Sequence, residues 1–169
     1  MIAWRLLLGL PLAVLAGCGW EPLYANHDSD TASADLRAIR VAPISERPGQ
    51  RLETALRNSF NPANEPTEAH YLLKVSLSTS VGDLGIQSQG LGTRGSVSVS
   101  ASYTLTDLRA NKGLQSASMH ATDSFDIHAN GYSTVVAQDD AFTRTVEQIR
   151  REIVARLTLF MEQKAAAPS

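Results

Sequence analysis

The sequence predicts an α+β fold: a two-layer sandwich with a four-stranded sheet and two helices on one face, in the order β-α-β-β-β-α. Three observations predict it. Apolar and hydroxyl side chains alternate in several segments, without exception over 96–106, and apolar residues recur every three or four positions in two others. The length of 169 residues suits one domain with one core. Two helices can cover one side of the sheet, so its other side is expected to be polar.

The composition excludes several classes of protein. With 43% hydrophobic and 19% charged residues, the chain is typical of a folded domain. The net charge of −2 lacks the cationic excess that neutralises phosphates, so no nucleic-acid partner is expected. The one long apolar run, residues 6–16, is shorter than the roughly 20 residues of a membrane-spanning helix.

The N-terminus has the pattern of a secretory signal: Arg5, an apolar run, then small residues before Cys18. Leu15-Ala16-Gly17-Cys18 resembles the lipobox of bacterial lipoproteins, in which the cysteine is acylated and becomes the new N-terminus. Cys18 is the only cysteine, so no internal disulfide can use it, and acylation explains it. The alternative is an ordinary signal peptide with an unpaired thiol. Gly19, where an aspartate would imply inner-membrane retention, implies an outer-membrane lipoprotein facing the periplasm.

The chain divides into four predicted parts: a signal peptide (1–17), the lipidated Cys18 with a linker (18–35), an α/β domain (36–163) and a disordered tail (164–169). The linker prediction rests on residues 26–35, which are polar, acidic and aperiodic.

The first elements of the domain are a short strand within 36–44, a turn over 45–50 and a helix from Arg51 that stops at Asn61-Pro62. A loop with two prolines covers 61–68. Three strands follow, over 71–81, 96–106 and 117–127, each with one apolar row and one row rich in Ser and Thr. Between the first two of these, the glycine-bearing segment 82–93 is predicted to be a mobile connection. A turn lies at 111–113.

The last helix is predicted from the apolar spacing over 142–160, with Asp139 or Asp140 at its N-terminus, where carboxylates meet free amides. Glu147 with Arg151, and Glu152 with Arg156, have the i,i+4 spacing of surface ion pairs.

No catalytic or metal-binding pattern is found in the sequence. Two of the four histidines, His120 and His128, lie on one predicted strand roughly 26 Å apart, at about 3.3 Å per residue. Asp126 is placed to bond His128, yet no nucleophile elbow accompanies them. The glycine run 90–95 leads into a strand rather than a helix, so it is interpreted as a connection, not a phosphate loop. We therefore expect no enzyme, no metal and no cofactor.

A family resemblance starts at Cys18-Gly19-Trp20-Glu21-Pro22-Leu23-Tyr24, which is similar to the start of LptE, the lipopolysaccharide-assembly lipoprotein. It continues through residues 49–52, 56–58, 71–75 and 93–105 and the final helix. LptE proteins sit as a plug inside the β-barrel LptD. The resemblance thus implies a non-enzymatic partner of LptD that helps insert lipopolysaccharide into the outer leaflet. A face of small hydroxyl side chains suits the polar, wet lumen of such a barrel.

The family's contact with anionic lipopolysaccharide is attributed to basic residues before the third strand and near the start of the last helix. Here the first region has no cation until Arg94, which becomes the candidate contact because arginine can fork onto phosphate oxygens. Its alternative role is that of a charged strand residue. A second set of cations is expected to form a solvated face: Arg37, Arg40, Arg47, Arg51 and Arg57.

Two other functions remain open on the sequence. One is an auxiliary lipoprotein of a phospholipid transport system, which predicts an apolar groove. The other is an envelope hydrolase that uses a serine with His128.

Overall fold

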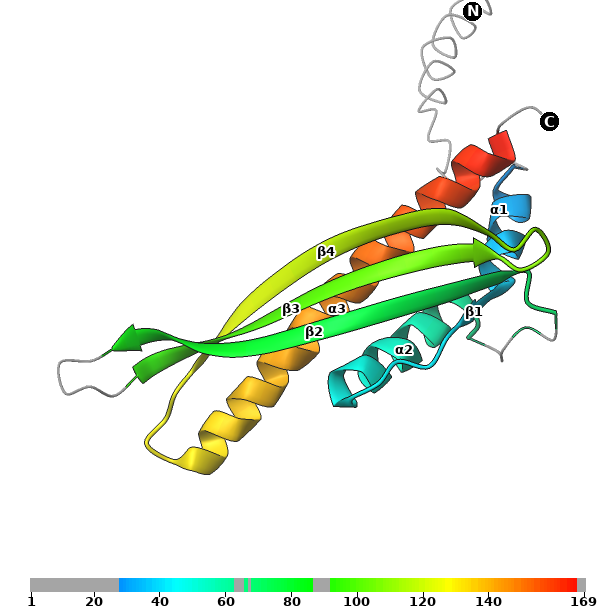
Figure 1. The fold of residues 1–169 in the computed structure, drawn as a ribbon. Coiled ribbons are helices and arrows are strands. Elements are labelled where there is room, and N and C mark those ends of the chain that lie inside the picture. The colour runs from blue at the N-terminus through cyan, green and yellow to red at the C-terminus, as the bar shows by residue number, and fades with distance from the viewer. Residues whose placement is uncertain (1–27, 63–65, 67, 87–91, 167–169) are drawn as a thin grey trace, which may run out of the picture.

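The computed structural model describes residues 28–62, 66, 68–86 and 92–166 (Figure 1). Its elements are α1 (Asp28–Arg37), β1 (Ile39–Val41), α2 (Arg47–Phe60), β2 (Tyr71–Ile86), β3 (Gly92–Asp107), β4 (Lys112–Asp126) and α3 (Gly131–Ala166). The strands form one four-stranded sheet in the order β1-β2-β3-β4; β1 is parallel to β2, and the other neighbours are antiparallel. The predicted α+β sandwich is confirmed, and α1 is added to it.

The core lies between the sheet and the helices. Figure 1 shows α3 crossing behind the long strands, with α1 and α2 towards one end of the molecule. The apolar row of β3 is buried against this layer, and α3 contributes a matching stripe spaced by four. The buried residues of these two elements include Val97, Val99, Ala101, Tyr103, Leu105, Ile149, Ile153, Leu157 and Met161. Burial of one row per strand leaves the opposite row outside.

The predicted linker is wrong over residues 28–35, which belong to α1. Ala32 of α1 is buried in the core, and Asp35 accepts a hydrogen bond from the Tyr71 hydroxyl (3.1 Å). Lys164 of α3 lies 3.4 Å from the same carboxylate. A helix this short is marginal alone, so these contacts with β2 and α3 stabilise it. The predicted disordered tail is likewise helical as far as Ala166.

Several predicted boundaries move. The first strand is reduced to β1, because Leu36 and Arg37 end α1. The helix predicted from Arg51 starts at Arg47, because proline is tolerated in the first turn, where its missing N–H costs nothing. Gly49 is buried there, and a Cβ on it would lie 2.6 Å from Cγ2 of Ile44, so only glycine fits.

The predicted mobile connection is mostly strand. β2 continues to Ile86 and β3 begins at Gly92, and the two stay paired through register shifts at Asp83/Gly85 and Gly85/Ile86. Glycines accommodate such bulges, which is why their presence did not end the strands. Residues 87–91 of the predicted connection lie outside the described residues.

Candidate functional site

The side of the sheet away from the helices carries a regular array of hydroxyl groups, which we call the open face. The strand registers align its side chains in rows across β2, β3 and β4. Three successive rows are Ser76–Ser102–Ser118, Ser78–Ser100–His120 and Ser80–Ser98–Thr122. All of these residues are exposed or half-exposed, so the predicted Ser/Thr face is present.

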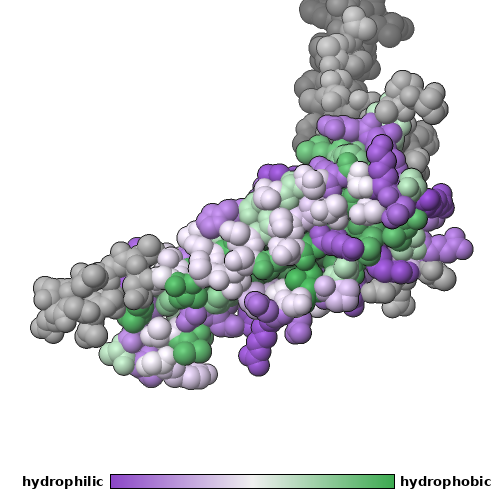
Figure 2. Space-filling model, in the orientation of Figure 1, coloured by the Kyte–Doolittle hydropathy of each residue, from purple (hydrophilic) through white to green (hydrophobic). Residues whose placement is uncertain are grey.

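The open face is hollowed at its centre. A shallow hollow of about 510 Å³ is lined by side chains of the first two rows, with Leu77, Ala101 and Met119 beneath them. Figure 2, in the same orientation as Figure 1, shows pale surface of intermediate hydropathy along the strands rather than one continuous apolar patch. The open face therefore offers a wet concave surface that a polar partner can contact.

Part of the array is internally hydrogen-bonded. Ser100 Oγ lies 3.0 Å from Nδ1 of His120, whose Nε2 lies 2.9 Å from Oγ1 of Thr122. Thr122 in turn lies 3.0 Å from Oγ of Ser98. Within the described residues, the other hydroxyls around the hollow make no side-chain hydrogen bond: Ser76, Ser78, Ser102 and Ser118. Each of these hydroxyls can donate or accept towards a partner.

The Ser100–His120 contact was missed by the sequence analysis, which considered only His128 as a base. The signal that finds it is the register of the β3–β4 hairpin, and a bulge between Leu105 and Thr106 shifts that register by one residue. A serine and a histidine at this distance resemble a nucleophile and its base.

The surroundings of this pair do not complete a catalytic site. Both ring nitrogens of His120 meet hydroxyls, so no carboxylate orients the ring as in a triad. Ser100 lies on β3, which has a strand on each side, so its backbone N–H belongs to the sheet and not to an oxyanion hole. His128 lies beyond β4, where its backbone N–H donates to Thr134 Oγ1 (2.9 Å), and Asp126 instead faces Arg94.

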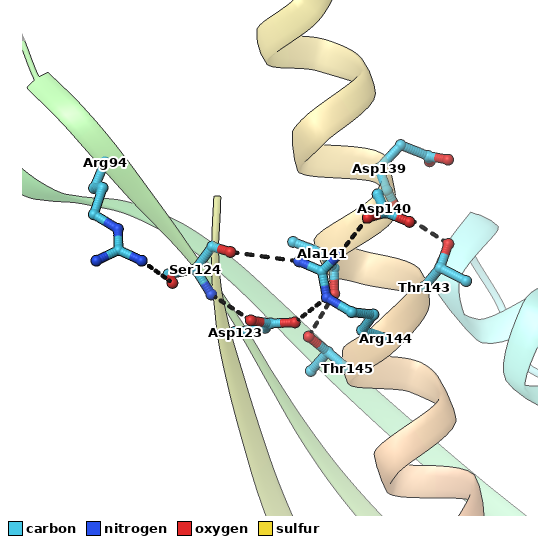
Figure 3. Close-up of polar contacts among 9 residues, drawn as sticks. All are labelled: Arg94, Asp123, Ser124, Asp139, Asp140, Ala141, Thr143, Arg144 and Thr145. Atoms are coloured by element: carbon cyan, nitrogen blue, oxygen red, sulfur yellow. Dashed lines mark hydrogen bonds and ion pairs between the residues drawn. The ribbon is translucent and has the colours of Figure 1, made fainter. Parts of the chain in front are cut away.

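At the far end of the sheet, charged residues of β3, β4 and α3 form the distal cluster: Arg94, Asp123, Asp126, Asp140 and Arg144, of which all but Asp126 are drawn in Figure 3. Nη2 of Arg94 donates to Ser124 Oγ (3.3 Å), and its Nε lies 3.6 Å from Asp126 Oδ1. Arg144 Nε donates to Asp123 Oδ2 at 2.5 Å, and Nη1 contacts Asp140. This hydrogen bond from Arg144 holds the pKa of Asp123 below its usual value.

The distal cluster joins three carboxylates to two guanidinium groups, so it has no surplus of positive charge. The Arg94 side chain is 63% exposed, which leaves its guanidinium accessible beside Asp126. The predicted N-terminal pair of the last helix lies inside α3 instead: Asp140 pairs with Arg144, and Asp139 pairs with Arg51 of α2 (2.8 Å).

The second set of cations predicted from the sequence is divided between two parts of the structure. Arg57 pairs with Glu53 (2.7 Å), whereas Arg37 and Arg40 are exposed near the opposite end of the sheet, so the second set of cations does not form a single face.

The described part of the chain contains no group of three or more metal-ligating side chains. In the same part, no helix combines the length and apolar character needed to cross a membrane. Cys18 lies outside the described residues.

The described residues form a small α+β sandwich with a hydroxyl-lined open face. The family model of LptE, described as lipopolysaccharide-assembly, matches residues 36–157. The chain belongs to the LptE family. No single curated protein sequence matches it.

Solved structures share the fold. A protein from Caulobacter crescentus described as a lipoprotein superposes with a TM-score of 0.62 at 19% identity, covering 77% of this chain and 95% of that one. Rare lipoprotein B from Shewanella oneidensis superposes with a TM-score of 0.50 at 8% identity, covering 70% of this chain and 94% of that one.

Proposed function

We propose that this chain is an outer-membrane lipoprotein, anchored at Cys18 on the periplasmic side, that binds and plugs the LptD β-barrel. In this role it helps to assemble the barrel and to insert lipopolysaccharide into the outer leaflet. Membership of the LptE family and the lipobox-like sequence support the proposal. The observation that carries it is the open face.

A barrel lumen is polar and filled with water, so a protein that lies inside it must present hydrogen-bonding groups rather than an apolar patch. Serine and threonine combine donor and acceptor capacity with small volume, so the partner backbone can approach closely. Free hydroxyls around the central hollow of the open face, such as Ser78 and Ser102, meet this requirement.

Cross-linking from defined positions tests the contact. A photo-reactive residue replaces Ser78, Ser102 or Ser118 on the open face, and Gln148 or Arg151 on the exposed side of α3 serves as the matched control. We expect adducts with LptD from the open face. Adducts from the α3 positions alone overturn the assignment of the face, and an absence of LptD adducts from all five positions overturns the partner.

Arg94 is proposed to contact the phosphates of lipopolysaccharide. Asp126 competes with such a phosphate for the guanidinium, so the two neighbours are expected to act in opposite directions. Arg94→Ala should weaken binding of purified lipopolysaccharide, and Asp126→Asn should strengthen it, with Arg151→Ala as an exposed control. Unchanged binding in both variants removes this role from Arg94.

The alternative of a phospholipid-transport auxiliary protein requires an apolar groove. The hollow between α2 and α3 has a mainly apolar surface, although Arg51, Thr54, Thr143 and Glu147 line it together with Ala55 and Val146. The hollow on the open face is lined by serines and His120 together with Leu77, Ala101 and Met119. Both hollows are shallow and open to solvent, so neither encloses an acyl chain.

A further inference from the structure

Exposed cations gather at the end of the molecule opposite the distal cluster. We call this region the basic end and define it by Arg37 at the end of α1, Arg40 on β1, and Leu108, Arg109 and Lys112 at the β3–β4 turn. All five residues are exposed, and Leu108 exposes 42% of its surface although it is apolar.

Backbone hydrogen bonds around His70 hold these segments together. The carbonyl of Ala38, next to Arg37, accepts from the backbone N–H of His70 (3.0 Å). The carbonyl of His70 accepts from the N–H of Leu108 (2.9 Å), and its ring nitrogen Nε2 contacts Nη2 of Arg109. The end of α1, the start of β1 and the turn are therefore one connected surface.

The turn is held in a defined shape. Oδ1 of Asp107 accepts from the backbone N–H groups of Arg109 (2.8 Å) and Ala110 (3.1 Å), and Asn111 takes a left-handed φ of 49°. Because the carboxylate of Asp107 is engaged by these amides, it points into the turn. Leu108 and Lys112 are thus presented outward by an ordered segment.

Most cations outside the basic end form ion pairs, with Arg47 and Lys74 as the exceptions among the described residues. Arg51, Arg94 and Arg144 each face a carboxylate. Within the described residues, Arg37, Arg40 and Lys112 form no ion pair. Unpaired cations around an exposed leucine are the pattern of a surface that binds anionic lipid headgroups and inserts an apolar side chain at the interface.

The chain outside the structure leads to this same surface. Cys18 precedes α1, which begins at Asp28, by ten residues, a reach of at most about 35 Å. α1 then runs into the basic end at Arg37. An acyl group on Cys18 would keep the basic end within reach of the bilayer.

We propose that the basic end docks on the anionic phospholipid surface of the membrane that holds the anchor, with Leu108 at the lipid interface and Arg37, Arg40 and Lys112 on the headgroups. This docking rests on the proposed anchoring for its location, and it adds an orientation: the basic end lies at the membrane surface, and the long strands carry the distal cluster from that surface into the barrel lumen. A single anchor gives no such orientation.

The test uses the mature acylated chain in vesicles of phosphatidylcholine with or without phosphatidylglycerol. Leu108→Cys provides the labelling site, because Cys18 is the only natural cysteine and its thiol is acylated. We expect an environment-sensitive dye there to report a lipid-like surrounding, and to be quenched by a headgroup-linked quencher, only in vesicles with phosphatidylglycerol.

Charge variants separate docking from tethering. Arg37→Glu with Lys112→Glu should abolish the signal, whereas Arg47→Glu with Arg151→Glu, the same charge change at exposed sites elsewhere, should keep it. Equal signals in both lipid mixtures, no signal in either, or equal loss in both double variants overturns the proposal.

The anchor and the docking surface can fail separately. If the chain does not remain on phosphatidylcholine vesicles, the anchoring of the proposed function is wrong. Flotation of that chain with phosphatidylglycerol vesicles then tests the basic end alone. Each Lys or Arg at an anionic surface contributes about five-fold to partitioning, so the Arg37/Lys112 variant should lose about 25-fold or more. A smaller loss than in the Arg47/Arg151 control overturns the docking surface.

Discussion

The ring of Phe125 on β4 lies directly over Gly95, its register partner on β3. A Cβ on Gly95 would come within 2.3 Å of Cζ of Phe125, and both residues are buried. The aromatic ring thereby covers a strand glycine that would otherwise leave a gap between sheet and helix layer.

This relationship predicts the effect of filling the space. Gly95→Ala should force the Phe125 ring out of its position and destabilise the protein by about 1–3 kcal/mol. Gly113→Ala is the matched control, because a Cβ there meets nothing within 4 Å. Denaturant unfolding of both variants measures the difference, and equal stabilities would contradict the close packing.

Gly95 also shows why the sequence predicted the strands better than their ends. Alternation of side chains identifies β2, β3 and β4 because one face is buried, and this period is visible residue by residue. Glycine carries no side chain to show the period, so the segment 82–93 looked like a connection. The structure shows that Gly85 of this segment sits at the bulges, and that Gly95, just after the segment, sits under a ring; both are properties of the folded sheet.

The helices show a second limit. Tyr132 and Val135 in the first turns of α3 are exposed, so no apolar stripe marked the start of this helix. A local signal existed: the Asn130 side chain accepts from the N–H of Tyr132 (3.0 Å), as an N-cap does. α1 had no comparable signal, because its stability comes from Tyr71 and Lys164 far along the chain.

We expect loss of the hydroxyl group to affect stability differently at two buried tyrosines. The Tyr103 hydroxyl is buried without a hydrogen-bond partner among the described residues, and burial raises the pKa of this group. Tyr103→Phe should leave stability unchanged or raise it by up to about 1 kcal/mol. Tyr71→Phe removes contacts with Asp35 (3.1 Å) and Lys164 (2.5 Å) and should cost about 1–3 kcal/mol. Thermal unfolding distinguishes them, and a larger loss for Tyr103→Phe would refute this assignment.

The free edge of β2 predicts where proline is tolerated. β1 ends at Val41, opposite Leu73, so β2 has no described neighbour on that side from Lys74 onward. The N–H of Tyr71 and the carbonyl of Leu73 point towards β1, which means that odd-numbered residues of β2 direct their backbone groups to this edge.

Thr79→Pro therefore removes an N–H that faces outward, whereas Ser78→Pro removes one that bonds β3. We expect Ser78→Pro to be the more destabilising by more than about 1 kcal/mol. Hydrogen exchange provides a second measurement, because the amide of Thr79 should exchange faster than that of Ser78. A larger loss of stability for Thr79→Pro than for Ser78→Pro, or slower exchange at Thr79 than at Ser78, would show that the outer edge of β2 is hydrogen-bonded to another segment.

Acid stability should depend on the bond between Asp123 and Arg144. The pKa of Asp123 is lowered from 3.8 in the folded protein, chiefly by the hydrogen bond from Arg144, so its stabilising contribution is present above that pH and lost as the pH falls. Asp123→Asn should flatten the acid limb of the stability curve, measured by denaturant unfolding between neutral pH and the acid transition. Arg144→Gln should flatten it as well, and the double variant should add little, because both changes remove one interaction. If the effects of the two changes on stability add fully in the double variant, the two side chains act independently. If Asp123→Asn keeps the wild-type slope of stability against pH, the acid sensitivity comes from other carboxylates, such as Glu147, whose pKa is lowered by Arg150.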